Sequence, residues 1–196
     1  MLSGDRRIFS INFSLRLKRF FLDSLRSSSK ASNIIIHYQS AHSRVGREAS
    51  ETRTMYTFQI TLHARPPQAA PGGLIALRGR TFPTLAVPRE ALSVGFALSF
   101  EDASARLAQL PRLFIEPDGS FVWVSPSTET TWQVDGVLYD RDGRLLFIDL
   151  KGRCPAESFD RLLAACGWPG TGMMCQLTRE AVFVDEATFR AIAAVT

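Results

Sequence analysis

Residues 133–152, QVDGVLYDRDGRLLFIDLKG, decide the fold expected for this chain. Two largely apolar runs flank the turn residues Arg141-Asp142-Gly143, a pattern typical of a β-hairpin. A three-residue loop that ends in Gly143 would be a type I turn with a G1 bulge, which pairs Asp140 with Arg144. The sequence therefore predicts two antiparallel strands in this segment.

The predicted register carries the chemical interest of the hairpin. It sets Asp135 opposite Asp149 and puts Lys151 on the same face. Two facing carboxylates repel unless a cation lies between them, and either Lys151 or Mg²⁺ could supply the positive charge. A two-residue loop would instead pair Asp135 with Leu150 and place the two aspartates on opposite faces. The face expected to pack on the core holds Val134, Leu138, Leu146, Ile148 and Leu150.

The segments around the hairpin predict an α+β fold with a mixed, mainly antiparallel sheet. Tyr56, Phe58, Ile60 and Leu62 alternate with polar residues, as in a half-buried strand. Further short strands are expected at LIALRG, TLAV and SVGFALSF, within residues 74–100. Beyond them, the predicted order is a helix at 101–110 capped by Ser99, strands at 120–125, 132–140 and 144–151, a helix at 156–166, a strand at 172–178, and a last helix capped by Asp185.

Asp135, Asp149 and Lys151 form the pattern D-x13-D-x-K on two antiparallel strands. With the predicted αβββαβ order, this pattern resembles the PD-(D/E)xK, or restriction-endonuclease-like, superfamily over roughly residues 100–180. The resemblance implies that Asp135 and Asp149 bind Mg²⁺ and that Lys151 is the catalytic lysine. It also implies Glu101, on the first helix, as a further acidic metal ligand. The implied activity is hydrolysis of nucleic-acid phosphodiesters.

Two departures from this family leave a second interpretation open. Val134 stands where the family has proline, and no basic recognition element is evident around the hairpin. Lys151 would then only bridge an aspartate at a solvated strand end, an arrangement that contributes little to stability. In this alternative the chain is a non-catalytic domain of the same architecture, a degenerate nuclease that binds another protein.

The charge of the chain is unevenly distributed. Residues 1–54 hold ten basic and four acidic residues, a formal charge of +6, whereas the remainder holds 13 basic and 15 acidic residues, a charge of −2. The first 54 residues are therefore expected to be a basic extension, disordered or amphipathic, with Met55 as an alternative start. Residues 55–196 are expected to form a single α+β domain. No apolar run is long enough for a transmembrane segment.

Histidine and cysteine limit the chemistry that the chain can perform. All three histidines, His37, His42 and His63, precede residue 64, so the last two thirds cannot supply a Ser-His-Asp triad alone. The three cysteines match no zinc-binding spacing and predict reduced thiols in a cytoplasmic protein. Catalysis in this part would depend on carboxylates, lysine, tyrosine, cysteine or a hard metal ion.

Overall fold

The structure, a computed structural model, describes residues 54–126 and 130–194. These residues belong to one compact unit, Ser50–Thr196. The predicted basic extension lies outside the described residues except for Thr54. Among the described helices, none is long and apolar enough to cross a bilayer.

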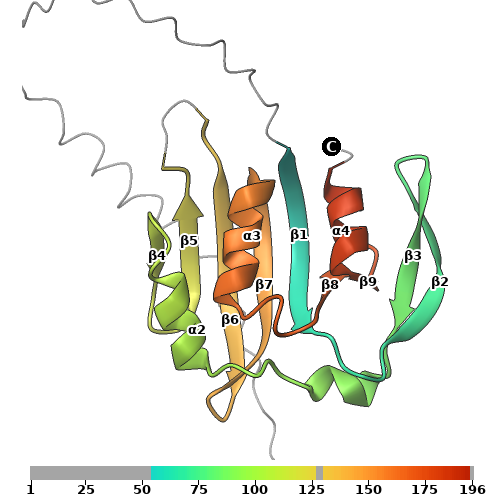
Figure 1. Cartoon of the computed structure of the whole chain (residues 1–196), viewed down its shortest axis with the longest axis horizontal. Helices are drawn as coiled ribbons and strands as arrows, with labels where there is room; N and C mark the ends of the chain where they lie inside the picture. Colours follow the sequence, from blue (N-terminus) through green and yellow to red (C-terminus); the bar gives the residue numbers. More distant parts are fainter. Residues whose placement is uncertain (1–53, 127–129, 195–196) are drawn as a thin grey trace, which may run out of the picture. The chain divides into compact units, whose positions relative to one another are not determined.

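Nine strands form one sheet in the order β2-β3-β9-β8-β1-β7-β6-β5-β4 (Figure 1). Every pair of neighbouring strands is antiparallel. The predicted α+β class with a mainly antiparallel sheet is therefore confirmed. The strands are β1 (Met55–Ala64), β2 (Ala70–Leu77), β3 (Arg80–Ala86), β4 (Leu113–Ile115), β5 (Ser120–Val124), β6 (Gln133–Arg141), β7 (Arg144–Pro155), β8 (Met173–Leu177) and β9 (Val182–Asp185).

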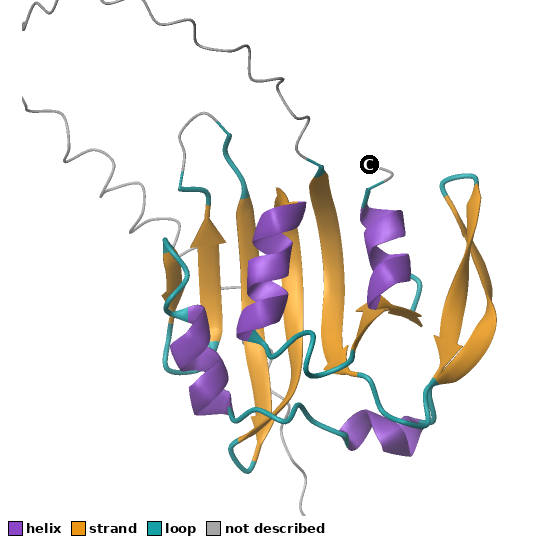
Figure 2. Ribbon diagram, in the orientation of Figure 1, coloured by secondary structure: helices purple, strands orange, loops and turns teal. Residues whose placement is uncertain are grey.

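Three α-helices lie on the same face of this sheet (Figure 2). They are α2 (Phe100–Leu107), α3 (Ala156–Ala165) and α4 (Glu186–Ala193); a 3₁₀ helix, η1 (Arg89–Ser93), precedes them. Both predicted caps are confirmed, because Ser99 accepts a hydrogen bond from the Asp102 amide and Asp185 accepts one from the Thr188 amide. The strand predicted at SVGFALSF is wrong, since that segment spans the end of η1, a loop and the start of α2.

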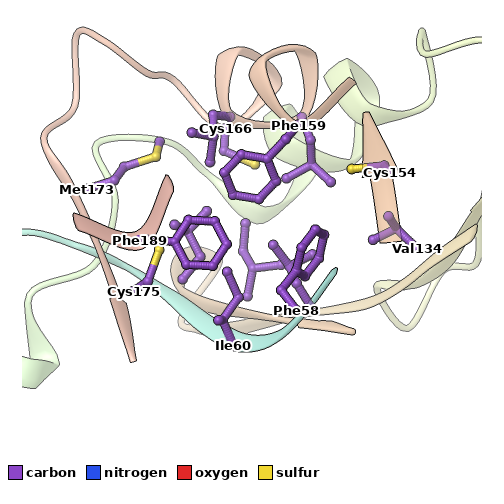
Figure 3. Close-up of a cluster of buried hydrophobic side chains, with 14 of the residues drawn as sticks. Phe58, Ile60, Val134, Cys154, Phe159, Cys166, Met173, Cys175 and Phe189 are labelled. Carbon is purple, nitrogen blue, oxygen red and sulfur yellow. The ribbon is translucent and has the colours of Figure 1, made fainter. Parts of the chain in front are cut away.

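The main hydrophobic core lies between the sheet and these helices (Figure 3). Phe159 of α3 and Phe189 of α4 have ring centroids 5.1 Å apart, and Phe58 of β1 packs against both rings. The alternation predicted for β1 is confirmed, because its apolar side chains point into this core. The buried side chains of β1 on this face are Tyr56, Phe58, Ile60 and Leu62.

The β6–β7 hairpin has a different register from the predicted one. Asp142 and Gly143 both have positive φ, 55° and 76°, so the turn is a two-residue type I′ turn that pairs Arg141 with Arg144. Leu146 is unmatched on β7 and forms a bulge, which shifts the pairing by one residue.

The bulge decides which side chains of the hairpin face the core. Because of it, Leu145 is fully buried while Leu146 is half-buried, so the predicted core position of Leu146 is wrong. The other predicted core residues of the hairpin are buried, namely Val134, Leu138, Ile148 and Leu150.

Candidate functional site on the open face

The face of the sheet opposite α2, α3 and α4 is hereafter the open face. Within residues 54–126 and 130–194, no α-helix lies over it (Figure 1). Strand alternation and register assign the side chains at its centre. They are Thr61 and His63 of β1, Phe147, Asp149, Lys151 and Arg153 of β7, Asp135, Val137 and Tyr139 of β6, and Gln176 of β8.

Asp135, Asp149 and Lys151 share the open face, but their pairing corrects the predicted register. Asp135 lies directly opposite Lys151, and Asp149 lies opposite Val137. The two aspartates are thus diagonal neighbours, a relationship in which Cα atoms are about 7–8 Å apart. The predicted Asp135–Asp149 pair is wrong. The alternative two-residue loop is confirmed, but the pairing of Asp135 with Leu150 that it implied is wrong, because the bulge at Leu146 brings both aspartates back to one face.

Asp149 is held in place by a hydroxyl group from a flanking strand. Thr61 of β1 donates a hydrogen bond from Oγ1 to Oδ1 of Asp149 at 2.7 Å. Tyr139 of β6, opposite Phe147, is a diagonal neighbour of Asp149 on the other side. Partial burial, reinforced by the negative charge of Asp149 and by hydrogen bonding with it, raises the pKa of Tyr139 and keeps the phenol protonated. The carboxylate is therefore held by a neutral hydroxyl donor.

Asp135 and Lys151 are less constrained. Asp135 accepts a hydrogen bond from Nε2 of Gln133 at 2.6 Å. The ion pairs within the described part of the chain are those of Arg190 with Asp160 and Glu186, so the exposed Lys151 has no ion-pair partner there. The ammonium group of Lys151 is available for an anion.

Gly152, next to Lys151, allows β7 to pack closely against β6. Gly152 has φ 150°, and a Cβ at this position would lie 2.1 Å from the Gln133 carbonyl oxygen and 2.8 Å from Val134 Cα. Only glycine fits this approach, because backbone atoms cannot move aside as a flexible side chain can. The glycine after Lys151 therefore serves the packing of the hairpin at this position.

His63 lies on the other side of Asp149, between aromatic rings. The Phe147 and Phe183 rings are each 5.6 Å from the His63 ring, and only 7% of the residue is exposed. Burial lowers the pKa of His63, while the charge of Asp149 and a hydrogen bond with Gln176 oppose this shift. Within the described residues, the buried Nε2 atom of His63 has no hydrogen-bond partner. His63 is thus a neutral imidazole at neutral pH.

Glu101 does not join this site. It is exposed on α2, whose buried residues Ala103 and Leu107 pack into the core on the opposite face of the sheet. The expectation that Glu101 binds the same metal as Asp135 and Asp149 is therefore wrong. Among the described residues, no three His, Cys, Asp or Glu side chains are grouped so as to hold a metal ion.

Comparisons with known proteins add no assignment to this geometry. No protein-family model matches the chain, and no curated protein or solved structure matches it either.

Sequence reasoning missed three side chains around Asp149, namely Thr61, His63 and Tyr139. The signal for two of them was available, because the alternation of YTFQITLH places Thr61 and His63 on the face away from the core. The sequence does not reveal that β1 pairs with β7, because Thr61 and Asp149 are 88 positions apart along the chain.

Proposed function

We propose that this protein hydrolyses phosphodiesters with a divalent metal ion, using Asp135, Asp149 and Lys151 on the open face. The observation that supports the proposal is the presence of two carboxylates and a lysine on neighbouring strands of one sheet face, where the described residues place no α-helix and give Lys151 no ion-pair partner. Nucleic acid is the substrate class that agrees with the sequence resemblance to PD-(D/E)xK nucleases. The proposal includes the assignment of the fold to the αβββαβ nuclease core that the sequence resemblance implies.

The two carboxylates fit Mg²⁺ by number and by chemistry. Mg²⁺ is commonly bound by one or two carboxylates, with water and substrate phosphate oxygens completing its coordination. Asp149 would be the ordered ligand, since the Thr61 hydroxyl holds it by a hydrogen bond. Asp135 would be the second ligand. A bound ion would supply Lewis-acid stabilisation of a phosphate and activation of water.

Lys151 would act on the substrate itself. Its ammonium group lies opposite Asp135 and has no ion-pair partner among the described residues. It can donate hydrogen bonds to a non-bridging phosphate oxygen and stabilise the negative charge that develops there. The lysine backbone is paired on both sides, with Gln59 of β1 and Asp135 of β6, so the strand that carries it lies inside the sheet.

The proposal is tested with the full chain, by calorimetric titration of Mg²⁺ and Mn²⁺ with and without bis(4-nitrophenyl) phosphate. Absorbance at equal metal concentration reports hydrolysis of the diester. We expect metal binding in the wild type and its loss in Asp149→Asn. Lys151→Met should retain the metal but lose hydrolysis by about 10²-fold or more, the usual cost of removing a group that stabilises transition-state charge.

Glu101→Gln is the matched control, because it removes an exposed carboxylate from the other face of the sheet. It should leave both metal binding and hydrolysis unchanged. A wild type that binds no metal even with the diester present, and does not hydrolyse it, would refute the proposal. Loss of binding in Glu101→Gln as large as in Asp149→Asn would refute the assignment of the site.

A second candidate function is a non-catalytic domain that binds another protein through the open face. The observation favouring it is that both aspartates already accept side-chain hydrogen bonds, from Gln133 and Thr61, and need no metal for satisfaction. This candidate predicts no metal affinity. Charge reversal at Lys151 should then weaken binding of the partner protein, and neither the wild type nor this variant should hydrolyse the diester.

A further inference from the structure

We propose that the open face binds single-stranded nucleic acid, with Lys151 and Arg153 on the phosphates and the Tyr139 ring stacked against a base. This inference rests on the proposed function, because it names the substrate of the same site. It adds two residues, Arg153 and Tyr139, to which neither the motif nor the proposed hydrolysis assigns contact with a substrate.

One column of side chains along β7 supplies the contacts to the backbone of the substrate. Arg153, Lys151, Asp149 and Phe147 are alternate residues of one strand and so lie on one face. Successive members are about 6.6–6.8 Å apart along the strand. The two cations are both exposed and adjacent, on one side of Asp149. They complement the charge of two phosphates next to the proposed metal position.

A row of rings on the other side of Asp149 supplies the contact to a base. The Tyr139 and Phe147 rings are stacked, with centroids 4.6 Å apart and an interplanar angle of 22°, and the His63 ring follows on β1. Tyr139 is 40% exposed, whereas His63 is 7% exposed. A ligand on the open face therefore meets the Tyr139 ring before the rings beyond it.

The Tyr139 ring is also ordered in advance of binding. Phe147 packs against the Tyr139 ring on one face, and Asp149, the proposed metal ligand, is a diagonal neighbour of Tyr139 across the β6–β7 ladder. A ring that is already immobilised loses little conformational entropy when a base stacks on it.

Single strands fit this arrangement and duplexes do not. Bases inside a duplex are already stacked on each other, whereas single-stranded bases can stack on aromatic side chains of an open sheet. The cations are few, and residues 55–196 carry a formal charge of −2, so a broad phosphate-binding surface is absent from this part of the sequence. Stacking must then provide a large share of the affinity.

The experiment measures fluorescence anisotropy of the full chain with a labelled 12-nucleotide oligo-dT and with a blunt duplex of the same length, both without divalent metal. We expect tighter binding of the single strand, by about tenfold. Tyr139→Ala should weaken single-strand binding by about tenfold, the typical loss of one base–aromatic stack, while Tyr139→Phe keeps the ring and most of the affinity. Arg153→Gln should reduce the slope of log affinity against log salt by about 0.7.

Phe114→Ala is the matched control, because Phe114 is an aromatic residue of edge strand β4 that is 53% exposed on the same face. It should change the affinity little. The inference is overturned if single strand and duplex bind equally, if neither binds, or if Phe114→Ala costs as much as Tyr139→Ala. Thermal unfolding of each variant shows that it is folded.

The failure of this inference can be separated from the failure of the proposed function. Metal binding that depends on Asp149, together with Tyr139-independent oligonucleotide binding, would refute the inference and leave the hydrolysis proposal standing. Single-strand binding that depends on Tyr139, in a protein that neither binds metal nor hydrolyses a diester, would refute the hydrolysis proposal and leave the binding of single strands standing.

Discussion

Asp135 lies directly across the β6–β7 ladder from Lys151, so residues of opposite charge occupy facing positions on the open face without forming an ion pair. Opposite charges in such positions stabilise a sheet by a few tenths to about 1 kcal/mol, and like charges destabilise it by a similar amount. The register of the hairpin is therefore measurable through the charge of these two residues alone.

Charge reversal at Lys151 tests this register. Lys151→Glu puts two carboxylates opposite each other and should lower the free energy of unfolding by up to about 1 kcal/mol. The double variant Asp135→Lys/Lys151→Glu should recover most of the loss, as measured by urea unfolding in a double-mutant cycle. A cycle without coupling would mean that the two side chains do not face each other. High salt should reduce the coupling.

Gly152 is expected to be intolerant of any side chain. Gly152→Ala should lower the free energy of unfolding by about 1–3 kcal/mol, since its Cβ would overlap backbone atoms of Gln133 and Val134. Gly73→Ala is the control, because a Cβ at Gly73 meets no atom within 4 Å. Urea unfolding curves of the two variants provide the comparison. Equal effects would show that β6 and β7 are not in close contact at Gly152.

His63 should make the stability depend on pH below neutrality. Burial holds its pKa below the unfolded value of 6.5, so the unfolded chain binds more protons in acid. The contribution of neutral His63 is fully present above pH 6.5 and decreases as the pH falls toward the folded-state pKa. The slope is at most about 1.4 kcal/mol per pH unit for one proton.

Two variants isolate this effect. His63→Gln does not titrate, so its free energy of unfolding should fall less than that of the wild type between pH 7.5 and pH 5.5. Asp149→Asn removes the charge that raises the pKa of His63, so its loss of stability should extend to lower pH. If the curves of His63→Gln and the wild type run parallel, the imidazole is not buried as a neutral group.

The three cysteines should be unreactive until the chain unfolds. Cys154, Cys166 and Cys175 are all buried. Burial raises the pKa of Cys154 and of Cys166 to about 12, and it also raises the pKa of Cys175. At pH 8, Ellman's reagent should therefore label native protein on the order of 10³-fold more slowly than an ordinary thiol.

The same assay in 8 M urea should count three thiols, since the chain has three cysteines. A thiol that reacts rapidly in the native protein would contradict the packing of α3 and α4 over β7 and β8. Cysteine→Ser variants would identify which position is open.

The sequence predicted the elements of the second half of the fold well because their signals are local. Ser99 and Asp185 cap helices through hydrogen bonds within one turn. The alternation of apolar and polar residues identifies β1 without any knowledge of its neighbouring strands. The short strand Val182–Asp185 was missed, since four residues running directly into a helix cap carry almost no periodic signal.

The site was harder to predict because it depends on non-local pairing. Asp135, Asp149 and Lys151 were predicted to share one face, and they do. The register used for that prediction was wrong, because Asp135 pairs with Lys151 and not with Asp149. The type I′ turn and the bulge each shift the pairing by one residue, and the two shifts restore the shared face. Glu101 failed for a related reason: sequence distance to the hairpin does not reveal which face of the sheet a helix covers.

The unpaired Leu146 divides the hairpin into two segments with different pairing registers, one next to the turn and one that carries Asp149 and Lys151. On the tip side, the Leu145 backbone is hydrogen-bonded to Phe96 and Leu98, whereas the length that carries Asp149 and Lys151 is clamped between β6 and β1. Residues inserted at Asp142-Gly143 should therefore change only the segment next to the turn and leave the register around Asp149 and Lys151 unchanged. Deletion of Leu146 would instead shift the pairing between the turn and the rest of the hairpin by one residue. Side chains near the turn would then exchange the core face of the sheet for the open face.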